Sequence, residues 1–313
     1  MIELINKLKS KWDINENIDE ENKSIEIVIR LIKVCNENCL FCNTNLDKSI
    51  IIYDDLIKII DYFIDKYFTN YSMYFSLSWW EPTIYPNFDK IVEYICQKWI
   101  NIKIQTNAVM FSNKSFIEKI IKYKNYISFF ISFHSHIEKI YNHITSSNLY
   151  YSSLLWIKNI YKNFDSDSIK INVVLNKINI NFFHEQIKFF DNFFSSYDVN
   201  IIISIIYPNK SYHKKLLVSY NKVVDVINTL NYTGKVKIIY EFWWYCQMPR
   251  CFFTKLKVDD SSVNEVWLDI DVWVQNMVKP SVCKKCIYNY KCIGLPRLYL
   301  EEFNYEEIIP IIK

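Results

Sequence analysis

Strand-like and helix-like segments alternate through most of this 313-residue chain. Six runs rich in Ile, Val, Phe and Tyr are typical of β-strands: 24–34, 71–78, 101–107, 126–134, 168–176 and 199–207. Six segments with apolar residues at helical spacing lie between or after them: 54–68, 87–98, 113–123, 152–164, 182–194 and 221–230. This alternation predicts parallel βαβ units with right-handed crossovers. Six repeats favour an α/β fold built as an open or partial (β/α)6 barrel rather than a full eight-fold one.

The alternating pattern changes after residue 235. The stretch KVKIIYEF predicts one more strand, and an irregular segment with five cysteines follows it. We therefore predict three parts: an N-terminal leader segment (1–23), the partial barrel (24–232) and a small C-terminal Cys-rich extension (233–313).

Composition argues against several classes of protein. The formal net charge is only +3, from 37 basic and 34 acidic residues, which gives no strong signal for nucleic-acid binding. No apolar run reaches the roughly 18 residues that a membrane helix needs, so we expect no membrane partner. The first residues lack the apolar core of a signal peptide, which makes the cytoplasm the expected location. In a reducing compartment, nine cysteines indicate metal binding rather than disulfides.

Three of the cysteines follow the first predicted strand. The segment VCNENCLFC places Cys35, Cys39 and Cys42 at C-x3-C-x2-C spacing. Three thiolates on one loop can hold three irons of a [4Fe–4S] cluster and leave the fourth iron open. A structural zinc site is the alternative, but zinc prefers four closed ligands and no histidine lies nearby.

With an aromatic residue, Phe41, before its last cysteine, this motif resembles that of the radical S-adenosylmethionine (SAM) superfamily. Further family motifs recur in order between residues 24 and 300. The family's Gly-Gly-Glu-Pro corresponds here to Trp79-Trp80-Glu81-Pro82, and its Thr-Asn-Gly to Thr106-Asn107-Ala108. The resemblance implies these cofactor-binding residues: Phe41, Trp79, Trp80, Glu81, Thr106, Asn107, Ser132, His134 and Asn176.

The resemblance also implies a mechanism. A [4Fe–4S] cluster on the three cysteines would bind SAM at its open iron and cleave it to methionine and a 5′-deoxyadenosyl radical, which abstracts hydrogen from a substrate. Glu81 would contact the SAM amino group, and Thr106 and Ser132 would hydrogen-bond the cofactor. The alternatives are a capping role for Glu81 and strand-end structural roles for the other residues, including His134 and Asn176.

Two tryptophans stand where the family has two glycines. Only Gly234 and Gly294 occur in the chain, whereas average usage of about 7% would give roughly twenty glycines. Tryptophan occurs nine times, and Trp99 and Trp156 also occupy glycine-like positions. We hypothesise that UGA codons were translated as Trp where the organism reads Gly, as some uncultured bacterial lineages do. The alternative is genuine tryptophans in a divergent, inactive protein.

A second cysteine cluster lies near the C-terminus. Cys283, Cys286 and Cys292 have C-x2-C-x5-C spacing, which resembles the auxiliary-cluster extensions of radical SAM enzymes, the SPASM and shorter twitch types. Pro296 breaks the longer SPASM pattern, so one twitch-like auxiliary [4Fe–4S] cluster is expected. Cys251 is the expected fourth ligand, with Cys246 as runner-up, and zinc is the alternative metal.

The substrate is not evident from the residues. Auxiliary extensions are often found in radical SAM enzymes that modify peptides or proteins, so the resemblance favours a peptide substrate. Small-metabolite or tRNA modification is an alternative within the same class, and a non-catalytic Fe–S or zinc protein that lost SAM binding is an alternative outside it. The resemblance also implies an electron donor such as flavodoxin or ferredoxin.

Overall fold

The computed structural model describes residues 2–12, 14–44, 47–112, 114–239, 248–257, 276–290 and 292–312. These residues form two compact units. The first unit contains Met1–Asn38, Thr44–Ser132 and Ser147–Lys170, and the second contains Cys39–Asn43, Phe133–Ser146 and Ile171–Lys313. None of the described helices is both long and apolar enough to span a membrane.

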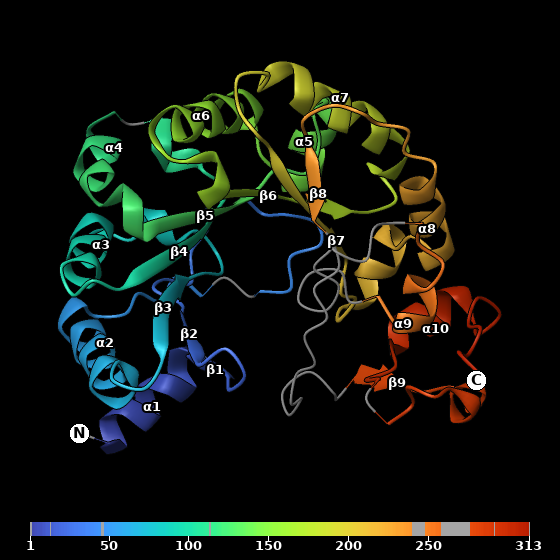
Figure 1. The fold of residues 1–313 in the computed structure, drawn as a ribbon, viewed down its shortest axis with the longest axis horizontal. Coiled ribbons are helices and arrows are strands. Elements are labelled where there is room, and N and C mark those ends of the chain that lie inside the picture. Colours follow the sequence, from blue (N-terminus) through green and yellow to red (C-terminus); the bar gives the residue numbers. More distant parts are fainter. Residues whose placement is uncertain are drawn as a thin grey trace. The chain divides into compact units, whose positions relative to one another are not determined.

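The first unit is a sheet of neighbouring strands flanked by helices. Its strands are β1 (Asn15–Asp19), β2 (Ser24–Ile29), β3 (Ser72–Leu77), β4 (Asn101–Thr106) and β5 (Ile127–Ser132). Its helices are α1 (Ile2–Trp12), α2 (Tyr53–Tyr67), α3 (Phe88–Cys96), α4 (Lys114–Ile120) and α6 (Tyr150–Asn163). Strands β2 to β5 pair in parallel in chain order, while β1 pairs antiparallel with β2. In Figure 1, α2, α3 and α4 lie along one side of these strands.

Apolar periodicity explains the packing within this unit. In α2, the buried residues recur at helical spacing and form one stripe: Leu56, Ile59, Ile60, Phe63 and Tyr67. Strand β2 alternates between partly exposed and buried residues before ending in three buried ones, Ile27, Val28 and Ile29. The carboxyl ends of β2, β3 and β4 meet at one edge of the sheet because the three strands are parallel.

The second unit also alternates strands with helices. Strand β6 (Ile169–Leu175) lies mostly in it, with β7 (Asn200–Ile205), β8 (Lys237–Ile239), β9 (Met277–Val278) and β10 (Leu295–Pro296). The helices are α5 (Glu138–Thr145), α7 (Phe183–Phe193), α8 (Tyr220–Asn228), α9 (Arg250–Phe253) and α10 (Arg297–Phe303). Strand β7 pairs in parallel with β8, and all six β7 residues are buried, as expected of a strand covered on both faces.

The predicted α/β class is confirmed, and the elements are consistent with a partial barrel. The six predicted parallel-type strands correspond to β2 through β7, and the strand expected from 235 begins as β8. The unpredicted helices and strands are α1, α5, α9, α10, β1, β9 and β10. The segment 1–23, interpreted only as a leader, contains α1 and β1, and β1 pairs with β2. The proposed boundaries at 23/24 and 232/233 stay predictions.

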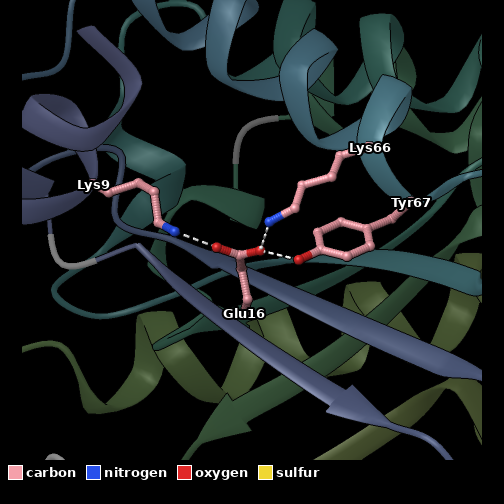
Figure 2. Close-up of polar contacts among 4 residues, drawn as sticks. All are labelled: Lys9, Glu16, Lys66 and Tyr67. Carbon is pink, nitrogen blue, oxygen red and sulfur yellow. Dashed lines mark hydrogen bonds and ion pairs between the residues drawn. The ribbon is translucent and has the colours of Figure 1, made fainter. Parts of the chain in front are cut away.

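A partly buried cluster of polar and charged side chains around Glu16 connects α1 and β1 to α2. The carboxylate of Glu16, on β1, accepts hydrogen bonds from Lys9 of α1 and from Lys66 and Tyr67 of α2, with Lys66 Nζ at 2.9 Å (Figure 2). Burial by itself would raise the pKa of Glu16, but these three donors outweigh it and lower the pKa from 4.5 to about 2. The ionised form of Glu16 therefore stabilises the folded state.

We expect Glu16→Gln to destabilise the protein by about 1.5–3 kcal/mol at pH 7, because charge-assisted hydrogen bonds are lost. Since the folded pKa is depressed, this contribution is present above the unfolded value of 4.5 and is lost as the pH falls toward about 2. Urea unfolding at pH 7 and pH 3 measures it. The difference between parent and variant should shrink at pH 3, whereas Glu21→Gln, at an exposed carboxylate, should change little at either pH. An equal difference at both pH values would contradict this account.

Candidate functional site

Cys35 lies in the first unit, beyond the end of β2. The carbonyl of the preceding residue, Val34, accepts a hydrogen bond from the backbone N–H of Glu81 at 3.1 Å. The backbone N–H of Glu37 donates to Cys35 Sγ at 3.4 Å. Backbone N–H groups that donate to cysteine sulfur in this way are common around iron–sulfur clusters.

The next two cysteines lie on a short segment, Cys39–Asn43, that belongs to the second unit. The backbone N–H of Leu40 donates to the carbonyl of Ile144 at 2.8 Å, and Lys210 Nζ donates to the carbonyl of Cys42 at 3.3 Å. Leu40 and Phe41 pack against a buried apolar cluster made of Val174, Ile206, Leu216 and Leu217. Apolar packing and hydrogen bonds therefore fix the backbone between Cys39 and Cys42.

The donor set of this loop fits an iron–sulfur cluster. Cys35, Cys39 and Cys42 are partly exposed, and no disulfide joins the cysteines that the structure describes. Across those same residues, no three His, Cys, Asp or Glu side chains are grouped closely enough to hold a single metal ion. A [4Fe–4S] cube differs from a single ion in this respect, since each thiolate binds a different iron.

Glu81 is fully buried and both of its carboxylate oxygens are engaged. Oε1 accepts hydrogen bonds from the Thr83 N–H at 3.2 Å, from the Thr83 hydroxyl, and from Thr106 Oγ1 at 2.7 Å, while Oε2 accepts from the Asn107 N–H at 2.7 Å. Burial raises the pKa of Glu81, and the hydrogen bonds act in the opposite direction. Glu81 also caps the 3-10 turn Pro82–Ile84, as the capping interpretation of this residue expects.

Thr106 and Asn107 join the same web of hydrogen bonds. Thr106 Oγ1 also accepts from the backbone N–H of Ala108 at 2.8 Å. Asn107 Nδ2 donates to Asn36 Oδ1 at 2.6 Å, next to Cys35 in the sequence. The structure therefore brings together the sequence-predicted residues Glu81, Thr106 and Asn107 with the residue that follows Cys35. Ser132, at the end of β5, is partly exposed.

His134 and Asn176 lie in the second unit, where their side chains form hydrogen bonds with backbone groups near the end of β6. His134 is buried, and its Nδ1 accepts from the Val174 N–H at 3.3 Å, while its ring meets Phe41 edge-on at 4.9 Å. Burial lowers the pKa of His134 to about 3, so its ring is neutral. Asn176 Nδ2 donates to the Val174 carbonyl at 3.1 Å, and its Oδ1 accepts from Ile178 N–H at 2.9 Å. Both side-chain ends of Asn176 thus have structural partners.

The backbone at the paired tryptophans is left-handed. Trp79 has φ 66° and Trp80 has φ 49°, a region that costs an ordinary residue about 1–2 kcal/mol and that glycine adopts freely. The Trp79 ring lies 3.9 Å from the guanidinium carbon of Arg30. The indole N–H of Trp80 is buried and has no hydrogen-bond partner within the described part of the chain. Both residues therefore occupy a backbone suited to glycine.

The other tryptophans divide into two groups. Trp99 has φ 64°, follows α3 and is 77% exposed, which is the setting of a helix-terminating glycine. Trp156, by contrast, is buried inside helix α6, where nothing in the backbone favours glycine. Trp12 is likewise a buried helical residue. Trp243, Trp244, Trp267 and Trp273 lie outside the described residues.

The second cysteine cluster gathers in one place. Cys251, Cys283, Cys286 and Cys292 all line a single cavity in the second unit, together with the basic residues Arg250 and Lys279. Burial, and after it the neighbouring thiols, raises the pKa of Cys251 to about 12. The arrangement brings Cys251 into the set with the C-x2-C-x5-C cysteines. Cys246, the other candidate ligand, lies outside the described residues.

A family model for the radical SAM superfamily matches residues 29–190. This range includes the first cysteine motif, Glu81 with its hydrogen-bond donors, and His134. The chain belongs to the radical SAM superfamily. Its fold and the order of its motifs along the chain agree with this assignment. A search of curated proteins found no match.

Solved structures with the same fold include radical SAM enzymes. The structure of anSMEcpe with bound AdoMet and Kp18Cys peptide is 13% identical, has a TM-score of 0.53, and matches over 66% of this chain and 58% of that one. Streptococcus suis SuiB bound to precursor peptide SuiA is 20% identical, has a TM-score of 0.54, and matches over 77% of this chain and 52% of that one. This radical SAM chain thus spans little more than half the length of either.

Sequence reasoning missed two residues that hold the cysteine loop. Asn36 lies inside the first cysteine motif but pairs with Asn107, 71 positions away. Lys210 reaches the carbonyl of Cys42 across 168 positions. The place of Asn36 inside the motif was a usable signal, whereas no local pattern marks Lys210.

We expect Trp99→Gly to stabilise the protein by about 0.5–1 kcal/mol, because relief of left-handed strain exceeds the entropy that glycine adds to the unfolded chain. Few contacts are lost, since Trp99 is 77% exposed. As a contrast, Trp12→Ala should destabilise by about 3–5 kcal/mol. Denaturant unfolding of both variants measures the difference. A Trp99→Gly protein less stable than the parent would contradict the strain argument.

Proposed function

We propose that the chain is a radical SAM enzyme that cleaves SAM reductively and abstracts hydrogen from a substrate. The observation that carries this proposal is the C-x3-C-x2-C loop inside the family-matched region: its three cysteines form no disulfide, and the backbone at Val34 and at Leu40 is held by hydrogen bonds. Three ligands suit a [4Fe–4S] cluster with one open iron better than they suit a closed zinc site.

In this proposal, Cys35, Cys39 and Cys42 hold the cluster. When bound, the cluster supplies the electron that converts SAM to methionine and a 5′-deoxyadenosyl radical. The packing of Leu40 and Phe41 against the buried apolar cluster of the second unit keeps two ligands in place. The neutral ring of His134 supports Phe41 without adding charge near the cluster.

The polar residues after β3, β4 and β5 are the proposed SAM contacts. Thr106, Asn107 and Ser132 follow or end neighbouring parallel strands, at the end where such folds bind ligands. The carboxylate of Glu81 is occupied by protein donors, so its proposed contact to the SAM amino group is shared with a structural role. Asn176 contributes mainly to its own turn.

Glycine at positions 79, 80 and 99 is part of the proposal. A left-handed backbone at each position suits glycine, and two indoles beside Glu81 would fill space that a cofactor needs. The proposal does not extend to Trp156, because this residue is buried inside helix α6. The remaining alternative is a chain with genuine tryptophans that has lost SAM binding.

The cavity lined by Cys251, Cys283, Cys286 and Cys292 is proposed to hold one auxiliary [4Fe–4S] cluster of the twitch type. Four thiolates would occupy all four irons, which suits electron transfer rather than direct substrate binding. Arg250 and Lys279, on the same cavity, would offset the negative charge. Zinc is the competing metal for this site.

A peptide is the proposed substrate class. It is supported by the likeness in fold to anSMEcpe and SuiB, whose structures contain peptides. Small-metabolite or tRNA modification is the alternative within the same chemistry. The reducing electron would come from a donor such as flavodoxin or ferredoxin.

The Trp79→Gly/Trp80→Gly double variant should form 5′-deoxyadenosine about tenfold faster than the parent protein, because glycine has no side chain to keep SAM from the backbone. Both proteins are reconstituted anaerobically with iron and sulfide, reduced with dithionite and assayed by chromatography. Adding Cys42→Ala to the double variant should abolish the product. Equal SAM binding and equal product formation by the two proteins would contradict the steric argument.

The iron content tests the auxiliary site. Reconstituted parent protein should contain about eight irons per chain, and Cys283→Ala/Cys286→Ala should contain about four, because the two cysteines that remain at the cavity are too few to hold the second cluster. Cys246→Ala is the matched control and should keep about eight. A parent protein with about four irons and one zinc would overturn the proposed auxiliary cluster while leaving the SAM-binding cluster intact.

A further inference from the structure

A closed ring of hydrogen bonds brackets Cys35 in the first unit. On one side of the cysteine, the carbonyl of Val34 accepts from the Glu81 N–H at 3.1 Å. On the other side, Oδ1 of Asn36 accepts from Asn107 Nδ2 at 2.6 Å. The ring closes because the Asn107 N–H donates to Glu81 Oε2 at 2.7 Å.

The ring is rigid because its far side is buried and fully engaged. Glu81 is 0% exposed and Asn107 is 5% exposed, so water does not compete for their hydrogen bonds. Asn107 Oδ1 accepts from the Val109 N–H at 3.1 Å, which fixes the amide with Nδ2 toward Asn36. Thr106 Oγ1 donates a hydrogen bond to the other carboxylate oxygen of Glu81, Oε1, at 2.7 Å. The side chain of Asn107 thus has one orientation available.

We infer that Asn36 and Asn107 are positioning residues that, with Glu81, fix the Cys35 thiol. Glu81 then also acts on the cysteine loop, through the backbone of Val34 and the Asn36–Asn107 pair. The contacts alone predict that the loop around Cys35 is well ordered. The consequence of this order for a bound cluster rests on the proposed function.

The pair also sets the surroundings of the sulfur. Asn36 Oδ1 lies 3.9 Å from Cys35 Sγ, and the Glu37 N–H donates to the same sulfur at 3.4 Å. A carbonyl oxygen held near a thiolate opposes the extra negative charge of a reduced cluster. Removal of that oxygen should therefore raise the midpoint potential, since groups around the sulfurs tune it.

Amide hydrogen exchange tests the ring without any cofactor. Asn36→Leu and Asn107→Leu should each speed exchange in a peptide covering 34–38 by about fivefold, the effect of losing one hydrogen bond. The double variant should exchange no faster than the faster single variant, because both changes remove the same bond. Asn36→Asp keeps an acceptor oxygen and should retain protection, and Ser128→Ala, at a hydroxyl that donates to the Ile102 carbonyl rather than to a residue of the ring, should not alter 34–38.

The midpoint potential of the reconstituted first cluster, measured without SAM in a Cys283→Ala/Cys286→Ala background, tests the effect on the sulfur. Asn36→Leu should shift the potential upward, while Ser128→Ala should leave it unchanged. Unchanged exchange in both leucine variants, or additive effects in the double variant, would overturn the inference. A parent protein that assembles no iron would instead refute the proposed function, and the exchange experiment would still decide whether the ring exists.

Discussion

The site depends on one buried carboxylate. Glu81 collects donors from Thr83, Thr106 and Asn107, and its own N–H reaches the carbonyl before Cys35. A buried carboxylate is costly unless donors surround it, so the loops after β2, β3 and β4 are held to the positions that supply them. Because these strands are parallel, their ends already lie at one edge of the sheet, and Glu81 connects them there.

The backbone just before Glu81 has a left-handed conformation, which places the carboxylate near its hydrogen-bond donors. Residues 79 and 80 both have positive φ, and the chain turns there from the end of β3 into the capped 3-10 turn. Glycine adopts this conformation without strain, whereas two indoles add strain and an unpartnered buried N–H among the described residues. The same backbone that positions Glu81 therefore explains why the identity of residues 79 and 80 bears on cofactor binding.

The sequence predicted regular elements where periodicity is strong. Segments such as 54–68 and 168–176 carry clear helical or strand patterns, and the structure has α2 and β6 there. Strand β1 was missed because NENID has no apolar alternation; its pairing with β2 and the ion cluster at Glu16 define it. Such tertiary contacts leave no local pattern in the sequence.

The candidate site was predictable to the level of motifs. The cysteine spacings and the glycine-like position of residue 99 follow from local rules, and glycine at 79 and 80 was expected from the family resemblance, whereas the helical setting of Trp156 required the fold. The pairing of Asn36 with Asn107 depends on strand order and side-chain orientation, so it could not be read from the chain.

The central claim is that Cys35, Cys39 and Cys42 hold a cluster with one iron open to SAM. Electron paramagnetic resonance of the reduced cluster tests it most directly, with glycine at 79 and 80 and with Cys283 and Cys286 replaced by alanine. The account predicts about four irons per chain and a reduced-cluster signal that changes when SAM is added. Zinc in place of iron, or an iron signal that SAM leaves unchanged, would contradict it.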